Sequence, residues 1–191
     1  MGDVVTALGR AIKEEGHKVQ VVIPKFDCIN FNQVEGLHRD GSFSYGGTIV
    51  HVWKGVVEEL QTVFLEPDNG FFGVGCIYGK NNDNARYEIE RHFCTMYYII
   101  DQDITFQCRF AFFCGSALEY INVRNVHADI LHCHDWPTAP ISWGDRRKSK
   151  VVFTIHNLSY GGDLIGRAMA SCEVATTVSP TYAREVRIFI D

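Results

Sequence analysis

The sequence predicts an α/β fold built on a doubly wound parallel sheet, and two stretches carry that prediction. Ala128, Ile130 and Leu131 are the apolar residues of a predicted buried strand, which His-Cys-His-Asp follows at 132–135. Residues 150–155 form a β-branched, apolar run followed by His-Asn at 156–157. The distance between the two runs fits a strand–helix–strand crossover. Because ligands bind at the carboxyl ends of strands in open α/β sheets, we expect these polar residues to share one site.

The elements before these runs alternate as such a fold requires. Residues 2–16 carry an apolar stripe at the helical period, with Asp3 suited to the helix start and Gly16 to its end. Residues 17–24 then form a strand that ends at a proline. A strand normally precedes the first helix of such a sheet. The stretch 2–16 is therefore either an ordinary N-terminal helix or the remainder of a unit whose first strand and glycine-rich loop are lacking.

The remaining elements follow from alternation and turn residues. We expect β structure over 45–66, with a turn at Gly46 and Gly47 and a second turn at 68–70, before an aromatic, glycine-rich loop that contains Tyr78. The expected strands are 48–53, 60–65, 128–134, 150–158 and 175–178, and the expected helices are 111–121, 137–143, a short one around 168–170 and a last one after 179.

Composition limits the functional classes. The chain has 191 residues, of which 46% are hydrophobic and 13% aromatic, which is enough for one globular domain with a sizeable core. A net charge of −5 gives no basic footprint for nucleic acid, and no apolar run reaches membrane-spanning length. The seven cysteines include no Cys-x-x-Cys pair, which favours reduced thiols over a disulfide scaffold.

The polar residues at the strand ends allow more than one chemistry. His132 and His134 lie two apart on a strand and therefore face the same side, which leaves a metal site with His156 as one alternative and packed, hydrogen-bonded histidines as another. Cys133 should face the opposite side and join the core. Asp135 could hold a hydroxyl, act as an acid or base, or pair with a buried basic side chain. Hydrogen bonding to a polyol would suit His134, Asp135 and His156 together with Asn157.

Three motifs, in this order along the chain, closely resemble the starch and glycogen synthases of glycosyltransferase family 5. They are His-Cys-His-Asp-Trp at 132–136, Phe-Thr-Ile-His-Asn-Leu at 153–158 and Thr-Thr-Val-Ser-Pro-Thr-Tyr-Ala-Arg-Glu at 176–185. The stretches 24–28 and 163–169 are most similar to the class III soluble starch synthases of plants. The motifs are specific together and weak singly, and the resemblance covers nearly the whole chain.

The resemblance implies a Rossmann-like domain, namely the N-terminal, acceptor-side half of a GT-B fold. It also implies an activity: glucose moves from ADP-glucose to the non-reducing end of an α-1,4-glucan such as an amylopectin chain of starch, with retention of configuration. No metal or other cofactor is implied, and neither nucleic acid nor membrane is an expected partner. The implied location is a plastid, either a chloroplast or an amyloplast.

Roles for individual residues are also carried over by motif position. The resemblance implies that His156 binds the transferred glucose and that Asp135 lies beside the reacting centre, which makes these two the predicted catalytic residues. The positions that it implies for substrate binding are Gly2, Asp3, Tyr78, His134 and Asn157.

The chain departs from the family pattern in ways that bear on activity. The lysine and paired glycines that precede Gly2 in the family are absent, and so is the second GT-B domain, which supplies the basic residues facing the donor diphosphate. Stabilising that leaving group is where such a site gains most of its rate. We therefore expect residues 1–185 to be an incomplete, inactive catalytic domain. The alternative is a non-catalytic glucan-binding or interaction module.

One stretch and the tail have no counterpart in the family. Removing residues 87–108 joins 82–86 directly to the Arg-Phe-Ala-Phe-Phe motif at 109–113 and restores the family pattern. Codons for the flanking residues can contain splice-site-like strings. We hypothesise that 87–108 and the tail 186–191 are translated intron sequence, and the alternative is a genuine lineage-specific insertion and tail.

Overall fold

The computed structural model describes residues 2–73, 75, 77, 104–144 and 148–188, and it divides the chain into two compact units. The N-terminal unit is Met1–Ala117 and the C-terminal unit is Leu118–Asp191. Both contain parallel strand pairs together with helices, so the predicted α/β class is confirmed. Within the described residues no helix is both long and apolar enough to cross a membrane.

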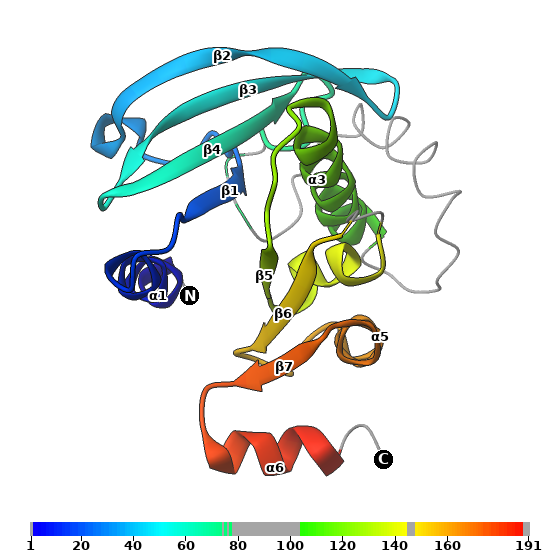
Figure 1. Ribbon diagram of the computed structural model, residues 1–191. Helices are drawn as coiled ribbons and strands as arrows, with labels where there is room; N and C mark the ends of the chain where they lie inside the picture. Colours follow the sequence, from blue (N-terminus) through cyan, green and yellow to red (C-terminus); the bar gives the residue numbers. More distant parts are fainter. Residues whose placement is uncertain (1, 74, 76, 78–103, 145–147, 189–191) are drawn as a thin grey trace. The chain divides into compact units, whose positions relative to one another are not determined.

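The N-terminal unit is organised by a four-stranded sheet with the order β1-β4-β3-β2 (Figure 1). The β1–β4 pair is parallel, whereas β4–β3 and β3–β2 are antiparallel. Its elements are α1 (Gly2–Glu14), β1 (Gln20–Pro24), η1 (Phe31–Gln33), β2 (Glu35–Tyr45), β3 (Thr48–Val57), β4 (Leu60–Pro67) and the larger part of α3 (Ile104–Val123).

The antiparallel hairpin β2–β3 is the main addition to the predicted sheet. Its turn is at Gly46 and Gly47, with φ of 57° and 75°, which suits the two-residue turn expected there. The β3 strand continues past residue 53 to Val57, and β4 continues to Pro67. The sequence did not predict β2, because its glycines, charges and two register irregularities hide the alternation of a strand.

Aromatic packing joins the sheet of this unit to α3, which runs along one of its faces (Figure 1). The buried ring of Phe112 meets Tyr45 and Phe71 edge to face, with centroids 5.3 Å and 5.2 Å apart. Edge-to-face pairs of this kind add to the energy of burial. Gly115, one turn further along α3, has no room for a side chain because a Cβ there would overlap Tyr45. The helix therefore approaches β2 closely at this point.

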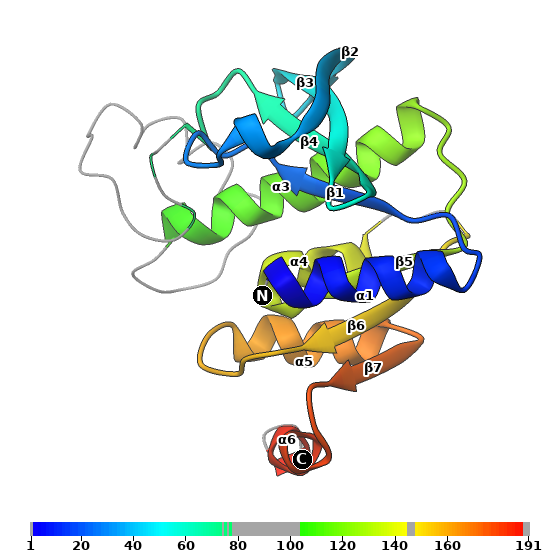
Figure 2. The ribbon, with the colours of Figure 1, turned by 90° about the vertical axis from the view of Figure 1, so that its left-hand side faces the viewer.

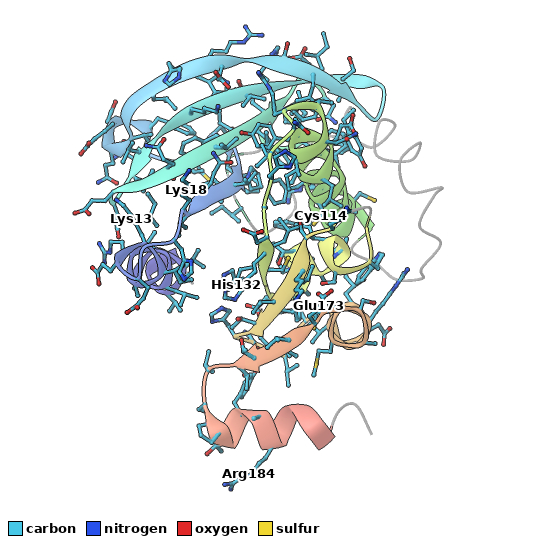
Figure 3. The ribbon with its side chains drawn as sticks, viewed as in Figure 1. Lys13, Lys18, Cys114, His132, Glu173 and Arg184 are labelled. Carbon is cyan, nitrogen blue, oxygen red and sulfur yellow. The ribbon has the colours of Figure 1, made fainter. Side chains whose placement is uncertain are left out.

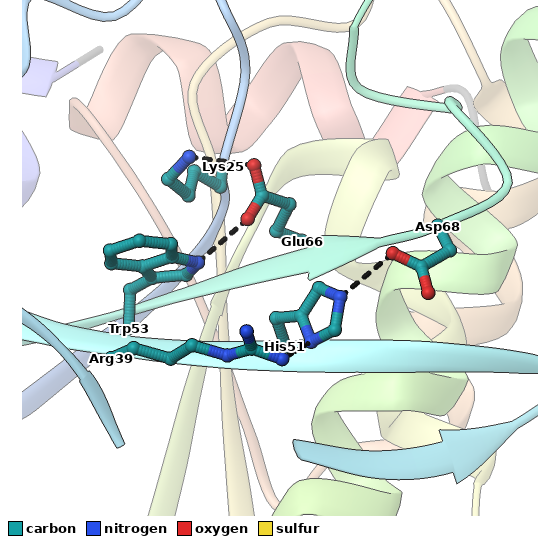
Figure 4. A network of polar contacts seen from close by, with 6 residues as sticks. All are labelled: Lys25, Arg39, His51, Trp53, Glu66 and Asp68. Carbon is teal, nitrogen blue, oxygen red and sulfur yellow. Dashed lines mark hydrogen bonds and ion pairs between the residues drawn. The ribbon is translucent and has the colours of Figure 1, made fainter. Parts of the chain in front are cut away.

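A polar cluster holds together another region of the same unit (Figure 4). The Nζ atom of Lys25 lies 2.7 Å from Oε1 of Glu66, and the indole N–H of Trp53 donates to Oε2 of the same carboxylate at 2.7 Å. The ammonium also lies over the rings of Phe31 and Trp53, at 4.9 Å and 4.8 Å from their centroids. Lys25 is therefore bound by both charge and aromatic faces, which stabilises this half-buried cation.

A second polar chain lies beside the first (Figure 4). Arg39 donates to Nδ1 of His51, and Nε2 of His51 lies 2.7 Å from Oδ1 of Asp68. Because a guanidinium only donates, Nδ1 of His51 is the acceptor. Its Nε2–H is then the donor of the hydrogen bond to Asp68. Strands β2 and β3 are thereby linked to the turn after β4.

The C-terminal unit is built on a three-stranded parallel sheet with the order β5-β6-β7. Figure 2 shows α5 lying along β6. Cys133 and Phe153 face α5 and pack with Ile165 and Ala168 in a dry core, which confirms that Cys133 is a core residue. The elements are β5 (Ile130–His134), α4 (Asp135–Thr138), η3 (Ala139–Trp143), β6 (Lys150–Ile155), α5 (Gly162–Ser171), β7 (Val174–Thr177) and α6 (Pro180–Ile188).

The helix expected at 137–143 differs from the prediction. It begins two residues earlier, at Asp135, and changes after Thr138 into the 3₁₀ helix η3. The physical reason is Pro140, which has no N–H to donate to the carbonyl four residues earlier. The N–H of Ala139 instead reaches the carbonyl of Trp136, three residues back.

The stretch proposed as an insertion is only partly described. Helix α3 begins at Ile104, before the predicted start at 111 and inside the proposed insertion 87–108, of which residues 87–103 lie outside the described residues. Helix α6 similarly continues to Ile188, inside the proposed tail 186–191. The intron hypothesis itself stays a prediction.

Candidate functional site

Four of the predicted site residues meet at one edge of the C-terminal sheet. Strands β5 and β6 are parallel and in register, with His134 opposite Thr154, so their carboxyl ends coincide. Oδ1 of Asp135 accepts hydrogen bonds from the backbone N–H groups of His156 at 2.6 Å and Asn157 at 3.1 Å. The carboxylate therefore fixes the turn in which β6 ends, and the polar residues that follow the two strands lie together.

The backbone of Asp135 has an unusual conformation that lets its side chain hold this turn. Its φ is 57°, in the left-handed region, which aspartate tolerates better than most residues. The side chain is 1% exposed, and its second oxygen, Oδ2, has no hydrogen-bond partner among the described residues. Backbone N–H groups, rather than the buried basic side chain considered from the sequence, are the partners of Oδ1. The carboxylate is thus buried beneath the turn that it holds, with Oδ2 closed off from solvent.

The imidazole of His134 links the two strand ends directly. Its Nδ1 lies 3.1 Å from Nε2 of His156, so one of these rings donates and the other accepts. Thr138, on the helix that follows, accepts from the backbone N–H of His134 at 2.6 Å and donates to its carbonyl at 2.9 Å. The ring is therefore positioned from three sides, by β5, α4 and the end of β6.

The two histidines of β5, His132 and His134, have a pKa below the ordinary value for an imidazole. His132 and His134 stack with centroids 4.4 Å apart, which confirms that they face the same side of β5. Burial, followed by the neighbouring His132 and His156, lowers the pKa of His134 from 6.5 to about 4. Burial and then His156 lower the pKa of His132 as well. Neutral imidazoles can donate and accept, which suits neutral hydroxyl groups better than it suits an anion.

His132 belongs to a hydrogen-bonded row across the sheet. Its Nε2 lies 2.7 Å from the hydroxyl of Thr154, which lies 2.6 Å from the hydroxyl of Thr176, so the row crosses all three strands. Figure 3 shows His132 projecting from β5 on the side opposite α5. The structure thus places His132 as a packed, hydrogen-bonded histidine. Across the described ranges, no group of three or more His, Cys, Asp or Glu side chains could hold a metal ion.

The loop after β6 is held by side chains instead of by a backbone ladder. Beyond the two bonds to Asp135, the N–H of Leu158 donates to the hydroxyl of Tyr182 at 2.7 Å, and that of Ser159 donates to Oδ1 of Asn157 at 2.7 Å. Tyr182 lies on α6 and was not predicted as a site residue. Its place in the motif at 176–185 was visible in the sequence, but no local pattern reveals a contact with a loop over twenty residues earlier.

Three of the predicted residues are not part of the described C-terminal unit. Gly2 and Asp3 begin α1, which belongs to the N-terminal unit. Tyr78 lies outside the described residues. The observed site is therefore formed by His134, Asp135, His156 and Asn157, with Thr138 and Tyr182 holding its backbone.

Comparisons of the sequence and of the structure with known proteins both find starch and glycogen synthases. A family model described as "Starch synthase catalytic domain" matches residues 1–169. Soluble starch synthase 3 (chloroplastic/amyloplastic) of Solanum tuberosum is 43% identical over 194 residues, covering 97% of this chain and 14% of that protein. A glycogen synthase of Protochlamydia amoebophila is 30% identical over 233 residues, covering 97% of this chain and 42% of its own length.

A solved structure is similar over the same extent. The catalytic domain of starch synthase IV from Arabidopsis thaliana, bound to ADP and acarbose, superposes with a TM-score of 0.77 at 28% identity. The match covers 97% of this chain and 43% of that one. The chain therefore spans less than half the length of each of these three proteins.

Proposed function

The chain belongs to the family of starch synthase catalytic domains, and we propose that it is the acceptor-side half of an ADP-glucose-dependent glucosyltransferase. The observation that carries the proposal is the shared site at the ends of β5 and β6. There a buried carboxylate orders the turn that presents His156 and Asn157. The substrates are ADP-glucose and the non-reducing end of an α-1,4-glucan, and the location is a plastid, as it is for the chloroplastic/amyloplastic starch synthases of the plant relatives.

The proposed reaction needs little from this half besides positioning. The bond between C1 of glucose and the β-phosphate oxygen breaks, and ADP leaves with the electron pair. The 4-hydroxyl oxygen of the acceptor forms its bond to C1 on the same face, and its proton passes to the departing phosphate oxygen. His156 binds the glucose being transferred and Asn157 binds the sugar next to it, while this half leaves the diphosphate to other groups of the enzyme.

Asp135 acts in this proposal through the turn. Its Oδ1 is occupied by two N–H groups, so the carboxylate stabilises the backbone that carries His156. Because Oδ2 is buried as well, the side chain serves to position the turn and does not itself contact the sugar. Replacing the carboxylate should therefore disturb the turn and, through it, the binding of the sugar by His156.

The second candidate function is a non-catalytic glucan-binding module. It is favoured by the short extent of the chain relative to the proteins that it matches, because a half-enzyme can bind without transferring. The two candidates differ in where they bind glucan. A catalytic half must bind glucan next to His156. A module that only attaches to glucan could bind it elsewhere, away from the ends of β5 and β6.

The test is calorimetric titration of the purified 191-residue chain with maltoheptaose and with ADP-glucose, together with an elongation assay using radiolabelled ADP-glucose. We expect maltoheptaose to bind and no elongation to occur. Asp135→Asn should weaken binding by about tenfold, which corresponds to about 1.4 kcal/mol. The control Asp163→Asn, an exposed carboxylate on α5, should leave it unchanged.

The outcomes separate the possibilities. Absence of maltoheptaose binding would overturn the proposal for this chain. Binding that is equally strong in both variants would favour the attachment module over the catalytic half. Elongation by the wild-type chain would establish transfer and contradict the expectation that the chain is incomplete.

A further inference from the structure

The loop between β6 and α5 carries the most exposed aromatic side chain among the described large hydrophobic residues. Tyr160 is 73% exposed and lies four residues after His156, at the same edge of the sheet as the candidate site. A single exposed apolar side chain on a protein surface needs no explanation by itself. What distinguishes Tyr160 is the fixed backbone on which it stands.

Contacts fix this loop on both sides of Tyr160. Before it, four consecutive N–H groups, from 156 to 159, donate to side-chain oxygens of Asp135, Tyr182 and Asn157. After it, Gly161 adopts φ 71° and lies so close to Trp136 that a Cβ would come within 2.5 Å of the indole side chain. The carbonyl of Gly161 then accepts the N–H of Ile165, in the first turn of α5, at 2.9 Å.

We propose that Tyr160 is a stacking surface for a glucose ring of the acceptor glucan, and this inference rests on the proposed function. A pyranose ring has a face of C–H groups that packs on an aromatic ring, while its edge of hydroxyl groups reaches neighbouring polar side chains. Ligand sites commonly combine such an aromatic surface with a few placed polar groups. Here the polar group is the side-chain amide of Asn157, on the same short loop, beside the residue His156 that holds the transferred glucose.

A fixed loop favours this assignment because it removes a cost of binding. A flexible loop would lose conformational freedom when a sugar stacked on it, whereas this one is held before the ligand arrives. The chemistry also favours a neutral ligand over the donor diphosphate. The loop sequence His-Asn-Leu-Ser-Tyr-Gly at 156–161 contains no lysine or arginine that would attract phosphate.

The test is titration of the 191-residue chain with maltoheptaose, in the wild type and in four variants. Tyr160→Ala removes the stacking surface, and Tyr160→Phe retains it. Tyr182→Phe removes only the hydroxyl that accepts from Leu158. Val174→Ala is the matched control, because it shortens another exposed apolar side chain of the same unit, 50% exposed. Circular dichroism and thermal melting verify that each variant is folded.

We expect Tyr160→Ala to raise the Kd for maltoheptaose by about tenfold, the usual cost of removing one stacking ring. Tyr160→Phe should restore binding to within about twofold, and Val174→Ala should have no effect. Tyr182→Phe should raise the Kd by about threefold, through lost preorganisation, with little change in melting temperature. The same variants titrated with ADP detect stacking on adenine.

Each result decides the inference separately from the proposed function. If the wild type binds maltoheptaose and Tyr160→Ala binds it equally well, the stacking role is wrong and the proposed function stands. If Tyr160→Ala weakens ADP binding but not maltoheptaose binding, Tyr160 contacts the donor and the inference is overturned. If the wild type does not bind maltoheptaose, the proposed function fails first and the inference fails with it.

Discussion

The pKa of His134 makes the stability of the C-terminal unit depend on pH in a defined direction. In the folded chain this pKa is lowered from 6.5 to about 4, first by burial and then by His132 and His156. Between these values the unfolded chain binds a proton that the folded chain excludes. The associated stability is therefore complete above about pH 6.5 and is lost as the pH falls towards about 4.

The size of the effect follows from the same two values. At pH 5 the linkage relation gives a loss of about 2 kcal/mol relative to pH 7 for a group shifted this far. Solvent reaches part of the imidazole, because His134 is only partly buried, so the observed loss should be reduced to about 1–1.5 kcal/mol. That is a large share of the stability of a domain of this size.

The assay is urea unfolding at pH 7 and pH 5, in the wild type and in two variants. His134→Gln keeps a hydrogen-bonding side chain that cannot be protonated, so its stability should change less between the two pH values, by about 1 kcal/mol. His17→Gln is the control, because it removes an exposed histidine from the N-terminal unit. Its pH dependence should match that of the wild type.

Direct titration of the imidazole signals by NMR completes this test. The signal of His134 should still report a neutral ring at pH 5. A His134 signal that titrates at pH 6 or above would refute the argument from burial, whatever the unfolding data show.

Three further substitutions test the packing around the site and the sheet by urea unfolding at neutral pH. Gly161→Ala should destabilise the chain by about 2–4 kcal/mol, because φ 71° and the contact with Trp136 both oppose a Cβ; an unchanged midpoint would refute it. Lys25→Met should cost about 1–2 kcal/mol by leaving Glu66 without its cation, and equal stability would show that the pair contributes nothing. Thr154→Val should cost about 1–2 kcal/mol by breaking the row across β5, β6 and β7, and an unchanged midpoint would show that the row does not stabilise the sheet.

The order of strands and helices in the C-terminal unit could be predicted because the residue pattern within each strand is sufficient to identify it. The run before His156 is β-branched and apolar, Ile130 and Leu131 precede His132, and the polar ends of both strands fall at one sheet edge because the strands are parallel. The same reasoning placed Cys133 in the core and both histidines of β5 on one face. The alternation of side chains along a strand is thus sufficient to predict which of them enter the core when one face of the strand is buried.

The features that the sequence did not predict depend on contacts between distant residues. Strand β2 is stabilised by pairing with β3, although its own residues favour no regular structure. The hydroxyl of Tyr182 and the N–H of Leu158 meet only after α6 has folded against the core. The left-handed backbone of Asp135 could not be predicted either, because it is imposed by the turn at 156–157 that the carboxylate holds.

The most direct test of the central claim is to map maltoheptaose onto the 191-residue chain by NMR, following each backbone amide during a titration. The account predicts saturable shifts for the amides of His156, Asn157 and Tyr160, at the end of β6, with smaller changes on the exposed strand β2. Saturable shifts confined to the N-terminal unit, with the amides of 156–160 unmoved, would contradict the claim that the ends of β5 and β6 form the acceptor-side site.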